Sequence, residues 1–450
     1  MQANEQKIEK IYDRLRNKGY NQWEIFFSSL DFQKITTRKE NIVETKKAVN
    51  EGYGIRIIED ERVGFAYSSD FSQEAIAATI DKAESIVNYS DKDINNILPE
   101  FEENPNKDPL NNVDESIKNL SIEQKINLAY QIEREAYRYD KRVVNTEEVG
   151  VSSGISETLL VSSKIPLQRN VSTYLGGYAE VIAQSGDQRE AGAYMQTSSA
   201  LVQFNPVNIG QKAAYRSTIL LDAVSLPTQK IDVVLDPTVA VQFLGVMAAL
   251  FDSEQVYKGK SLLKGNLGKP VSSPLLTIVD DGMYRGGLAS AYYDDEGVPT
   301  KRKVIMEDGI LKTYLYDSKN ANRANGKSTG NAFRSSYKMV PGISPSNIYI
   351  QPGEKNTEVF LKEAHKCFYI FEVMGLHMVN PISGEFSLGA QGILIEDGER
   401  TKAVKGVMIA GNLLDFLKQI YFIGDDLEFF SGNGYIGSPT VCIKDIMVGG

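Results

Sequence analysis

The longest apolar segment of the chain follows a short strand-like run near its middle. Ile231 to Leu235 has the β-branched content of a buried strand. Asp236 can accept a helix N-cap hydrogen bond, and Pro237 suits the first helical position. From Thr238 to Phe251 nearly every residue is apolar, with Gln242 as the exception. A helix that is apolar all round is buried, and this one is too short to cross a bilayer, so the pattern predicts a buried central helix.

Helical and strand-like segments alternate over the first half of the chain. Apolar residues at helical spacing predict helices over residues 5–18, after Ser72, over 121–139 and over about 208–223. Ser121 and Gln124 have the spacing of a capping box, which would begin the third of these helices. Strand patterns cover residues 24–30, 34–48, 52–69 and 143–201, with a hairpin turn near Asp60 and Glu61.

The second half has mainly the patterns of strands and turns. Beyond Gly282 almost all of it is predicted to be strand or turn, apart from a helix at Gly411–Ile420. Asp-Gly pairs at 308–309 and 397–398 are typical of hairpins. We therefore predict an α+β fold, in which an N-terminal region of mixed helices and strands precedes a large, mainly antiparallel sheet or barrel packed on the buried central helix. The expected boundaries are an N-terminal α+β domain at 1–90, a linker at 91–120, a central α+β segment at 121–225 and a C-terminal domain at 226–450.

Composition and charge narrow the possible functions. The 450 residues suffice for two or three domains with proper cores, and 42% hydrophobic and 24% charged residues are ordinary for a soluble protein. The formal net charge of −10 argues against nucleic-acid binding, which needs a basic face. The first residues lack the apolar run of a secretory signal, and no transmembrane segment is visible. We expect a cytoplasmic protein that binds neither nucleic acid nor membrane.

Few residues have the pattern of a catalytic or metal site. The predicted central helix carries no His, Cys, Asp, Glu or Lys between Thr238 and Phe251. The two cysteines, Cys367 and Cys442, exclude a disulfide framework and a CxxC site. The two histidines, His365 and His377, have no ligand motif around them, so a structural or surface role is favoured for each.

Long motifs around and beyond the central helix resemble those of a known family. They include LDPTVAVQFLG at the helix, KGKSLLKGNLGKP and LTIVDDG after it, and further on GLASAYYDDEGVPTKRKVIMEDGILKTYLYD, GEFSLGAQGILIEDGE and the terminal GSPT and MVGG. The chain resembles the PmbA (TldE) branch of the TldD/PmbA family. Members of this family were once described as modulators of DNA gyrase and are now regarded as peptidase subunits. The resemblance covers essentially the whole length.

The resemblance also indicates what this chain lacks. In the TldD branch the equivalent helix carries HExxxH, whose histidines bind zinc and whose glutamate acts as a base. The matching positions here are Gly245, Val246 and Leu250, none of which can bind a metal or move a proton. The TldD branch takes a Cys ligand from a segment near Asp425–Gly434 of this chain, which has no Cys, and Cys442 aligns with a non-ligand position. The resemblance therefore implies a subunit without the zinc site, with no catalytic or metal-binding residue of its own.

One further segment, MVNPISGEFSLGAQG, matches a strong signature of the family beside the cleft where peptide is handled. It supplies most of the candidate substrate-binding residues, and the polar loop at 320–336 supplies one more. The candidates are His377, Asn380, Ser383, Glu385, Ser387 and Arg323. A bulged hairpin that needs its glycines for backbone reasons explains the segment equally well. A carboxylate alone would not hydrolyse a peptide bond, because attack also needs an activated water and a stabilised oxyanion.

Three functional hypotheses follow from the sequence. The first is a non-catalytic, TldE/PmbA-like subunit of a zinc metallopeptidase complex that degrades or matures unfolded or short peptides, inactive alone and without a cofactor of its own. Its heterodimer partner, a TldD-like catalytic subunit, would carry the zinc. The second is a homodimeric peptide-binding or scaffold protein with no peptidase partner. The third is a metallopeptidase with an unrecognised metal site built from His365, His377 and carboxylates.

Overall fold

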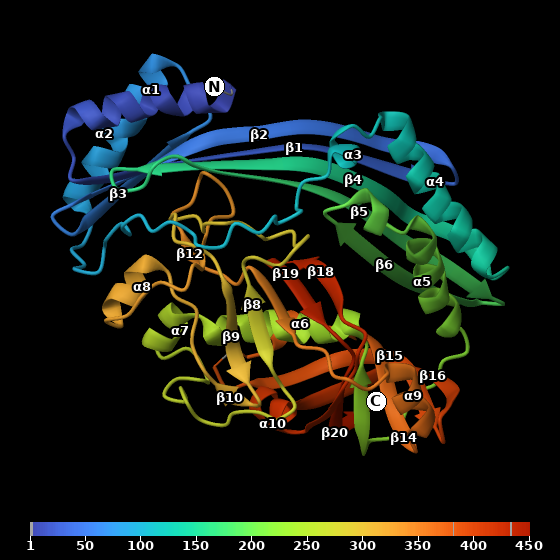
Figure 1. The fold of residues 1–450 in the computed structure, drawn as a ribbon. Coiled ribbons are helices and arrows are strands. Elements are labelled where there is room, and N and C mark those ends of the chain that lie inside the picture. The colour runs from blue at the N-terminus through green and yellow to red at the C-terminus, as the bar shows by residue number, and fades with distance from the viewer. Residues whose placement is uncertain (1–2, 381, 433) are drawn as a thin grey trace.

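A long, curved sheet arches over the C-terminal half of the chain in the computed structural model (Figure 1). The structure describes residues 3–380, 382–432 and 434–450. Helices flank the arching sheet at both of its ends, and strands make up most of the regular structure of the C-terminal half. The predicted α+β class is confirmed.

The arching sheet, called the N-terminal sheet below, consists of six antiparallel strands in the order β3-β2-β1-β4-β5-β6. Its central pair joins segments far apart in the sequence, because Phe26 of β1 lies opposite Leu160 of β4. The strands are β1 (Gln22–Arg38), β2 (Asn41–Glu59), β3 (Arg62–Ser68), β4 (Val143–Ser162), β5 (Gln168–Ser185) and β6 (Gln188–Ser198). One edge of the sheet is β6, which pairs only with β5 among the described residues.

Helices cover the face of the N-terminal sheet that turns away from the C-terminal half. One pair of helices packs with Ile25 and Ile55 at one end of the sheet, and a second pair packs with Val151 and Leu175 at the other. The first pair is α1 (Ala3–Lys18) and α2 (Gln73–Tyr89), the second is α4 (Ile122–Tyr139) and α5 (Pro206–Ile219), and the short helices α3 (Glu115–Lys118) and η1 (Leu201–Gln203) lie between them in sequence. The predicted cap at Ser72 and the capping box at Ser121 are both present.

One turn of this sheet departs from the sequence-based prediction. Residues 34–48 were expected to be a single strand, but the chain reverses at Lys39 and Glu40, which have φ of 52° and 51°. Neither residue type favours this left-handed conformation. The buried carboxylate of Glu133 on α4 accepts hydrogen bonds from the backbone N–H groups of Lys39 at 2.5 Å and of Glu40 at 2.6 Å. A distant side chain therefore holds the turn.

The C-terminal unit, residues 229–450, contains two six-stranded sheets. Their orders are β10-β9-β8-β13-β19-β18 and β16-β15-β14-β7-β20-β17, and an additional pairing of β16 with β20 closes part of the second sheet into a ring. Among the strands that the structure describes in this unit, the β7–β14 and β13–β19 pairs are parallel and the other pairs are antiparallel, which confirms a mainly antiparallel domain. The strands are β7 (Gln229–Leu235), β8 (Ile278–Asp281), β9 (Arg302–Glu307), β10 (Ile310–Leu311), β13 (Asn347–Ile350), β14 (Lys366–Met374), β15 (Glu385–Glu396), β16 (Glu399–Asn412), β17 (Ile420–Ile423), β18 (Glu428–Gly432), β19 (Gly434–Ser438) and β20 (Val441–Gly449), with β11 (Ala332–Phe333) and β12 (Gly342–Ile343) as a separate pair.

The predicted central helix is confirmed as α6 (Pro237–Ala248), which continues into η2 (Ala249–Phe251). The Asp236 side chain accepts from the N–H of Thr238 at 2.9 Å, as expected of the N-cap residue. Phe243 stacks on Phe416 with ring centroids 4.9 Å apart, inside the largest apolar cluster of the protein. Close-packed burial of this kind stabilises the helix far more than its own propensity does.

Short helices interrupt the C-terminal unit more often than its sequence suggested. The region beyond Gly282 was expected to be almost entirely strand and turn, yet it also contains α8 (Ser318–Arg323), α9 (Thr357–Glu363) and η3 (Leu376–Met378), and α7 (Ser253–Tyr257) precedes it. These helices are too short for the apolar pattern to reveal them. The helix expected at Gly411–Ile420 is α10 (Leu413–Lys418). The hairpins at Asp308 and Asp397 are confirmed, with φ of 48° and 49°.

Within the described ranges, no helix has both the length and the apolar character needed to cross a membrane.

A buried ion network joins the N-terminal sheet to the C-terminal unit. Glu24 of β1 accepts hydrogen bonds from Arg56 of β2, at 2.8 Å, and from Arg334 of the C-terminal unit. Arg56 also pairs with Glu296 at 3.2 Å. Burial alone would raise the pKa of Glu24, but the two guanidinium groups hold it below its ordinary value. The network thus joins the sheet to the C-terminal unit through ion pairs that are buried away from water.

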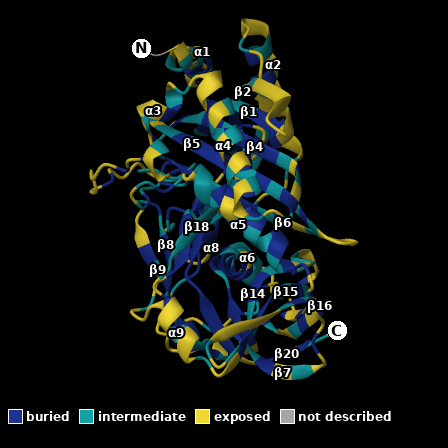
Figure 2. Cartoon of the chain, turned by 90° about the vertical axis from the view of Figure 1, so that its right-hand side faces the viewer, coloured by how far each residue is buried: buried dark blue, intermediate teal, exposed yellow. Residues whose placement is uncertain are grey.

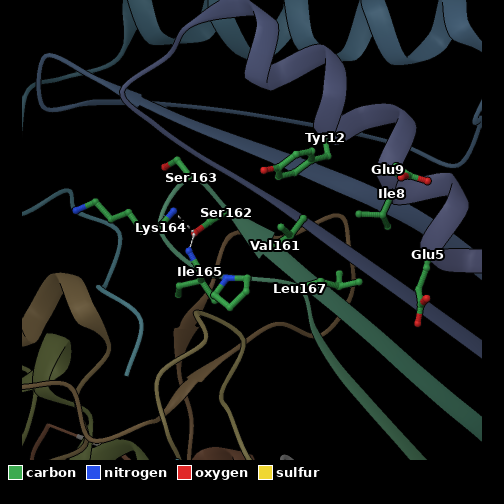
Figure 3. A pocket seen from close by; sticks show the side chains of 11 residues that line it. Glu5, Ile8, Glu9, Tyr12, Val161, Ser162, Ser163, Lys164, Ile165 and Leu167 are labelled. Atoms are coloured by element: carbon green, nitrogen blue, oxygen red, sulfur yellow. Dashed lines mark hydrogen bonds between the residues drawn. The ribbon is translucent and has the colours of Figure 1, made fainter. Parts of the chain in front are cut away.

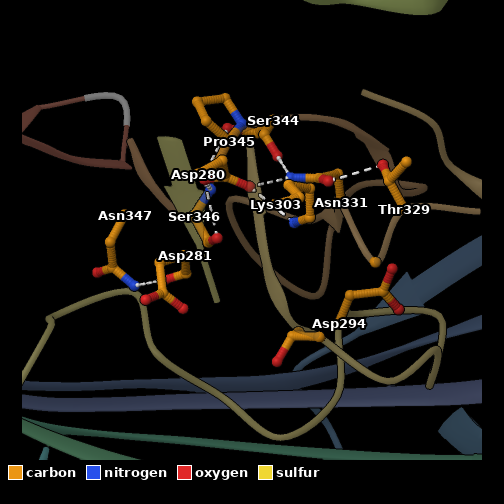
Figure 4. A network of polar contacts seen from close by, with 12 residues as sticks. Asp280, Asp281, Asp294, Lys303, Thr329, Asn331, Ser344, Pro345, Ser346 and Asn347 are labelled. Carbon is orange, nitrogen blue, oxygen red and sulfur yellow. Dashed lines mark hydrogen bonds and ion pairs between the residues drawn. The ribbon is translucent and has the colours of Figure 1, made fainter. Parts of the chain in front are cut away.

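A second buried network holds the residues that come directly before β11 and β13 (Figure 4). Asp280 of β8 accepts from the Lys303 ammonium at 2.9 Å and from the Asn331 amide at 2.8 Å. Its other oxygen accepts from the backbone N–H of Ser346 at 2.7 Å and from the Ser346 hydroxyl at 3.0 Å. One fully buried carboxylate therefore organises four donors from three segments.

Asp317, the N-cap residue of α8, provides a test of pH-dependent stability. Burial, with a contribution from Glu296, raises the pKa of Asp317 to about 6. Because the pKa is higher in the folded state, the free energy of unfolding is highest below about pH 4, where the carboxyl is protonated in both states. This contribution to stability is lost as the pH rises through about 6. Asn also caps helices well, so Asp317→Asn keeps the cap and removes the charge. We expect the variant to gain up to about 3 kcal/mol in the free energy of unfolding at about pH 8 and nothing at about pH 4.

Urea unfolding of both proteins at the two pH values measures this difference. Asp60→Asn, in an exposed turn at φ 47° that Asn also adopts, is the matched control and should give no gain at either pH. Equal stability of Asp317→Asn and the wild type at about pH 8 would contradict the prediction.

Candidate functional site

The central helix forms one wall of a cavity of about 370 Å³, called the α6 cavity below. The other walls come from β5 and β6 of the N-terminal sheet, from α5, and from β18 and β19 of the C-terminal unit. Figure 2 shows α5, β6 and β18 around α6. The lining includes Tyr178, Ala193, Met195, Arg216, Gly245, Phe430 and Ile436. The cavity therefore lies where an edge strand of one sheet, β6, meets an edge strand of another, β18.

Most of the surface of the α6 cavity is apolar or aromatic. Val241 and Ile436 face it from α6 and β19, and Met195 faces it from β6. The ring of Tyr194 meets that of Phe430 nearly at right angles, with centroids 6.3 Å apart. Pockets that bind small ligands or side chains commonly combine such walls with a few polar groups.

The charged groups around the α6 cavity are already paired. Arg216 of α5 donates to the hydroxyl of Thr238 at 2.7 Å, lies 3.3 Å from the carboxylate of Asp236, and stacks over the ring of Tyr194. Burial raises the pKa of the Tyr194 hydroxyl to about 12, and that hydroxyl donates to Glu428. Lys212 also pairs with Glu428, at 3.0 Å. No net charge from these groups is left to attract an ionic ligand.

The face of α6 toward the cavity is formed by Thr238, Val241, Gln242 and Gly245. A Cβ atom added at Gly245 would have only Ile436 within 4 Å, at 3.2 Å, so the position borders open space. Of the other two positions matched to HExxxH, Val246 is half-buried against the core and Leu250 is buried in η2. Only Gly245 of the three lines the cavity.

The donor set of the α6 cavity does not fit zinc. Structural and catalytic zinc ions take His, Cys and carboxylate ligands. The lining residues offer hydroxyl groups, one amide and one guanidinium instead, and the guanidinium of Arg216 would repel a divalent cation. In the parts of the chain that the structure describes, no group of three or more His, Cys, Asp and Glu side chains is placed to hold a metal ion.

The histidines and cysteines lie away from this cavity. His365 follows α9 on the surface, where its ring lies 2.5 Å from the Asp397 carboxylate. Cys367 and Cys442 are buried together in a small apolar cluster. Burial raises the pKa of the Cys367 thiol to about 12, so it is not a thiolate at neutral pH.

Five of the six predicted substrate-binding residues lie together at the connection of β14 and β15. His377 is in η3, and Asn380 accepts from the backbone N–H groups of residues 382 and 383, at 2.9 Å and 3.1 Å. The Ser383 hydroxyl donates to Glu385 at 3.3 Å, and Ser387 is exposed on β15. These contacts organise an exposed turn, which agrees with the structural interpretation of the segment and leaves its substrate role a prediction.

Arg323, the sixth candidate, belongs to a different cluster. It donates to Asp93 at 2.9 Å and to Asn320 at 2.6 Å, and it stacks over the ring of Tyr257. These contacts tie α8 to the segment that was predicted to be a linker. None of the six candidates lines the α6 cavity.

Gly245 was singled out as a position matched to HExxxH, but no residue of the α6 cavity was predicted to bind substrate, because its walls come from strands and helices that meet only in the folded chain. One signal was available in the sequence. Gln242 is the one polar exception in an otherwise apolar helix, and its exposed side chain is at the cavity. A lone polar residue on a buried helix indicates the side on which the helix borders solvent.

Two of the other cavities involve the N-terminal sheet. One of about 410 Å³ lies between the N-terminal sheet and the loops of the C-terminal unit, and Asp294 and Asp295 line it. Burial raises the pKa of Asp294 to about 8 and that of Asp295 to about 6. The other, of about 480 Å³, lies between α1 and the end of β4, where Ile8 and Tyr12 face Leu167 (Figure 3). Neither contains part of α6.

Comparison with known proteins shows the family to which this chain is similar. Models of the PmbA/TldA metallopeptidase family match three stretches: domain 1 at residues 23–87, the central domain at 115–221 and the C-terminal domain at 228–450. The metalloprotease PmbA of Escherichia coli is 30% identical over 422 residues, which cover 92% of this chain and 89% of that protein. A metalloprotease TldD homolog of Buchnera aphidicola is 26% identical over 475 residues, covering 100% of this chain and 97% of the relative.

Solved structures agree with this result. A candidate modulator of DNA gyrase from Thermotoga maritima superposes with a TM-score of 0.90 at 26% identity, covering 99% of this chain and 100% of that one. TldE from Thermococcus kodakarensis has the same fold, with a TM-score of 0.90 at 20% identity and the same coverage. The chain belongs to the PmbA/TldD metallopeptidase family.

Proposed function

We propose that this chain is a non-catalytic, peptide-handling subunit of a cytoplasmic zinc metallopeptidase complex. The observation that carries the proposal is the donor set of the α6 cavity. In a family whose relatives are named metalloproteases, the central helix here presents Thr238, Gln242 and Gly245 where a zinc site would need His, Cys or carboxylate ligands. The zinc and the base would come from a TldD-type partner.

The open edge of β6 supports a role in holding peptides. The carbonyl of Ala193 accepts from Arg216 at 3.1 Å, which shows that the main chain of Ala193 points out of the sheet and that this carbonyl is already occupied. In an antiparallel strand, the N–H and C=O of one residue point to the same side. The N–H of Ala193, and the main chain of Met195 two residues later, therefore lie on the same open edge. An extended peptide can add to such an edge through main-chain hydrogen bonds.

Main-chain recognition of this kind suits unfolded or short peptides. A folded protein has already paired its backbone groups, whereas an unfolded segment offers them freely. The α6 cavity, next to the edge of β6, would receive part of the segment. The subunit would then position peptide for cleavage at the partner's zinc site, without a proton-transfer step of its own.

Isolation of the complex from its own cells is the experiment that tests this function. A native pull-down of the full chain is expected to recover a protein of similar size that carries HExxxH. Recovery of the chain only as a homodimer would favour the alternative, a peptide-binding or scaffold protein without a catalytic partner.

The isolated chain is expected to contain much less than one zinc ion per molecule and to leave an unfolded peptide intact. Adding the HExxxH partner should restore cleavage, and a chelator should abolish it, because the zinc then belongs to the partner. Metal analysis and a peptide-cleavage assay measure both effects. A partner whose HExxxH glutamate is changed to glutamine is the control, since it should assemble without cleaving. Chelator-sensitive cleavage by the isolated chain would contradict the proposal.

A further inference from the structure

The chemistry of the α6 cavity indicates which side chain of a bound peptide it would accept. Its walls at Met195, Val241, Phe430 and Ile436 are apolar, and the nearby Arg216 is already paired with Asp236. A charged side chain placed there would lose its hydration without gaining a free partner. An apolar side chain has no such hydration to lose, and removing its apolar surface from water is favourable.

The register of β6 brings such a side chain to the cavity. Met195 pairs with Tyr178 of β5, and both side chains lie on one face of the sheet and line the cavity. Side chains of an added strand alternate between the two faces. Every second side chain of a peptide paired with β6 would therefore point to the face that carries Met195 and Tyr178.

Gly245 keeps the bottom of the cavity open. It occupies the interior of α6, where glycine costs roughly 1 kcal/mol relative to alanine in an ordinary helix. No close backbone contact requires glycine there, because a Cβ would meet only the end of the Ile436 side chain, at 3.2 Å. The missing side chain instead leaves space that any larger residue would fill.

We propose that the α6 cavity is a specificity pocket for one bulky apolar side chain of the bound peptide, of the Leu, Met or Phe type, and that Gly245 keeps this pocket open. The inference rests on the proposed function, since it requires that the chain binds peptides. It goes further by naming the substrate class: unfolded segments that carry such a residue at the position facing α6.

The test uses the full chain and a set of soluble, end-capped peptides in extended form. They share one sequence and differ only in a central residue, which is Ser, Ala, Leu or Phe, and fluorescence anisotropy measures their binding. Full burial of Leu or Phe should tighten binding about tenfold or more relative to Ala. Ser should bind no better than Ala.

Gly245→Leu is expected to fill the pocket and bring Leu and Phe peptides to the affinity of the Ala peptide. Gly326→Leu is the matched control, because Gly326 is exposed and its nearest neighbour to an added Cβ lies 3.9 Å away. Circular dichroism of both variants checks that they fold. Met195→Lys is a second variant, placed at a half-exposed wall position that tolerates a longer side chain, and it should also remove the preference.

The outcomes separate this inference from the proposed function. Binding of all four peptides with equal affinity would overturn the specificity pocket while leaving peptide binding intact. A preference for Leu and Phe that persists in both Gly245→Leu and Met195→Lys would show that the selecting pocket is elsewhere. Absence of binding by every peptide would overturn the inference together with the proposed function.

Discussion

Asp280→Ala is expected to lower the free energy of unfolding by about 3–5 kcal/mol, the cost of removing one partner from a buried ion pair. The change would leave the Lys303 ammonium without its counter-charge in a buried site. It would also leave the Asn331 amide and the Ser346 backbone N–H without the oxygens that accept from them. Urea or thermal unfolding of the variant and the wild type measures the loss.

Two comparisons make this prediction specific. Glu307→Ala removes an exposed ion pair with Lys312 in the neighbouring hairpin and should cost at most about 1 kcal/mol. The double variant Asp280→Asn with Lys303→Met removes both charges and should recover part of the loss, since no unpaired charge stays buried. A loss below about 1 kcal/mol for Asp280→Ala would mean that the network contributes little to stability.

Glu24→Ala is expected to lower the free energy of unfolding by a similar amount, about 3–5 kcal/mol. It should also weaken the contact between the N-terminal sheet and the C-terminal unit. Glu24 is the acceptor shared by Arg56 of the N-terminal sheet and Arg334 of the C-terminal unit. Arg56 would keep Glu296, but Arg334 would lose its carboxylate partner. The N-terminal sheet should then detach more easily from the C-terminal unit. Faster limited proteolysis within residues 91–113 would detect this detachment, and unfolding measurements give the loss of stability.

Glu148→Ala is the matched control for this second prediction. Glu148 pairs with Lys34 on the same sheet at 2.9 Å, but both side chains are 40% exposed, so water screens the pair. Its removal should cost at most about 1 kcal/mol and leave the proteolysis pattern unchanged. Equal effects of Glu24→Ala and Glu148→Ala would contradict a special role for the buried network.

The candidate site shows how far local patterns reach. They predicted α6, its N-cap at Asp236 and its burial, because each depends on residues a few positions apart. They did not predict the α6 cavity, whose walls come from β5, β6, α5, α6, β18 and β19. The candidates chosen from the glycine-rich segment near Gly384 lie outside the α6 cavity. Glycine spacing indicates backbone conformation, but it does not indicate which distant residues come together in the fold.

Local sequence patterns were enough to predict the elements whose causes are local: α6, the capping box at Ser121, and the Asp-Gly hairpins at Asp308 and Asp397. The sequence also determined, through its resemblance to a known family, what the central helix lacks.

The way in which these elements combine became visible in the folded chain alone. The tertiary structure paired β1 with β4 across more than one hundred residues of sequence, held the turn at Lys39 through Glu133, and placed the open edge of β6 beside Gly245. Such contacts depend on burial and on charges brought together from distant segments. No short window of sequence contains both partners.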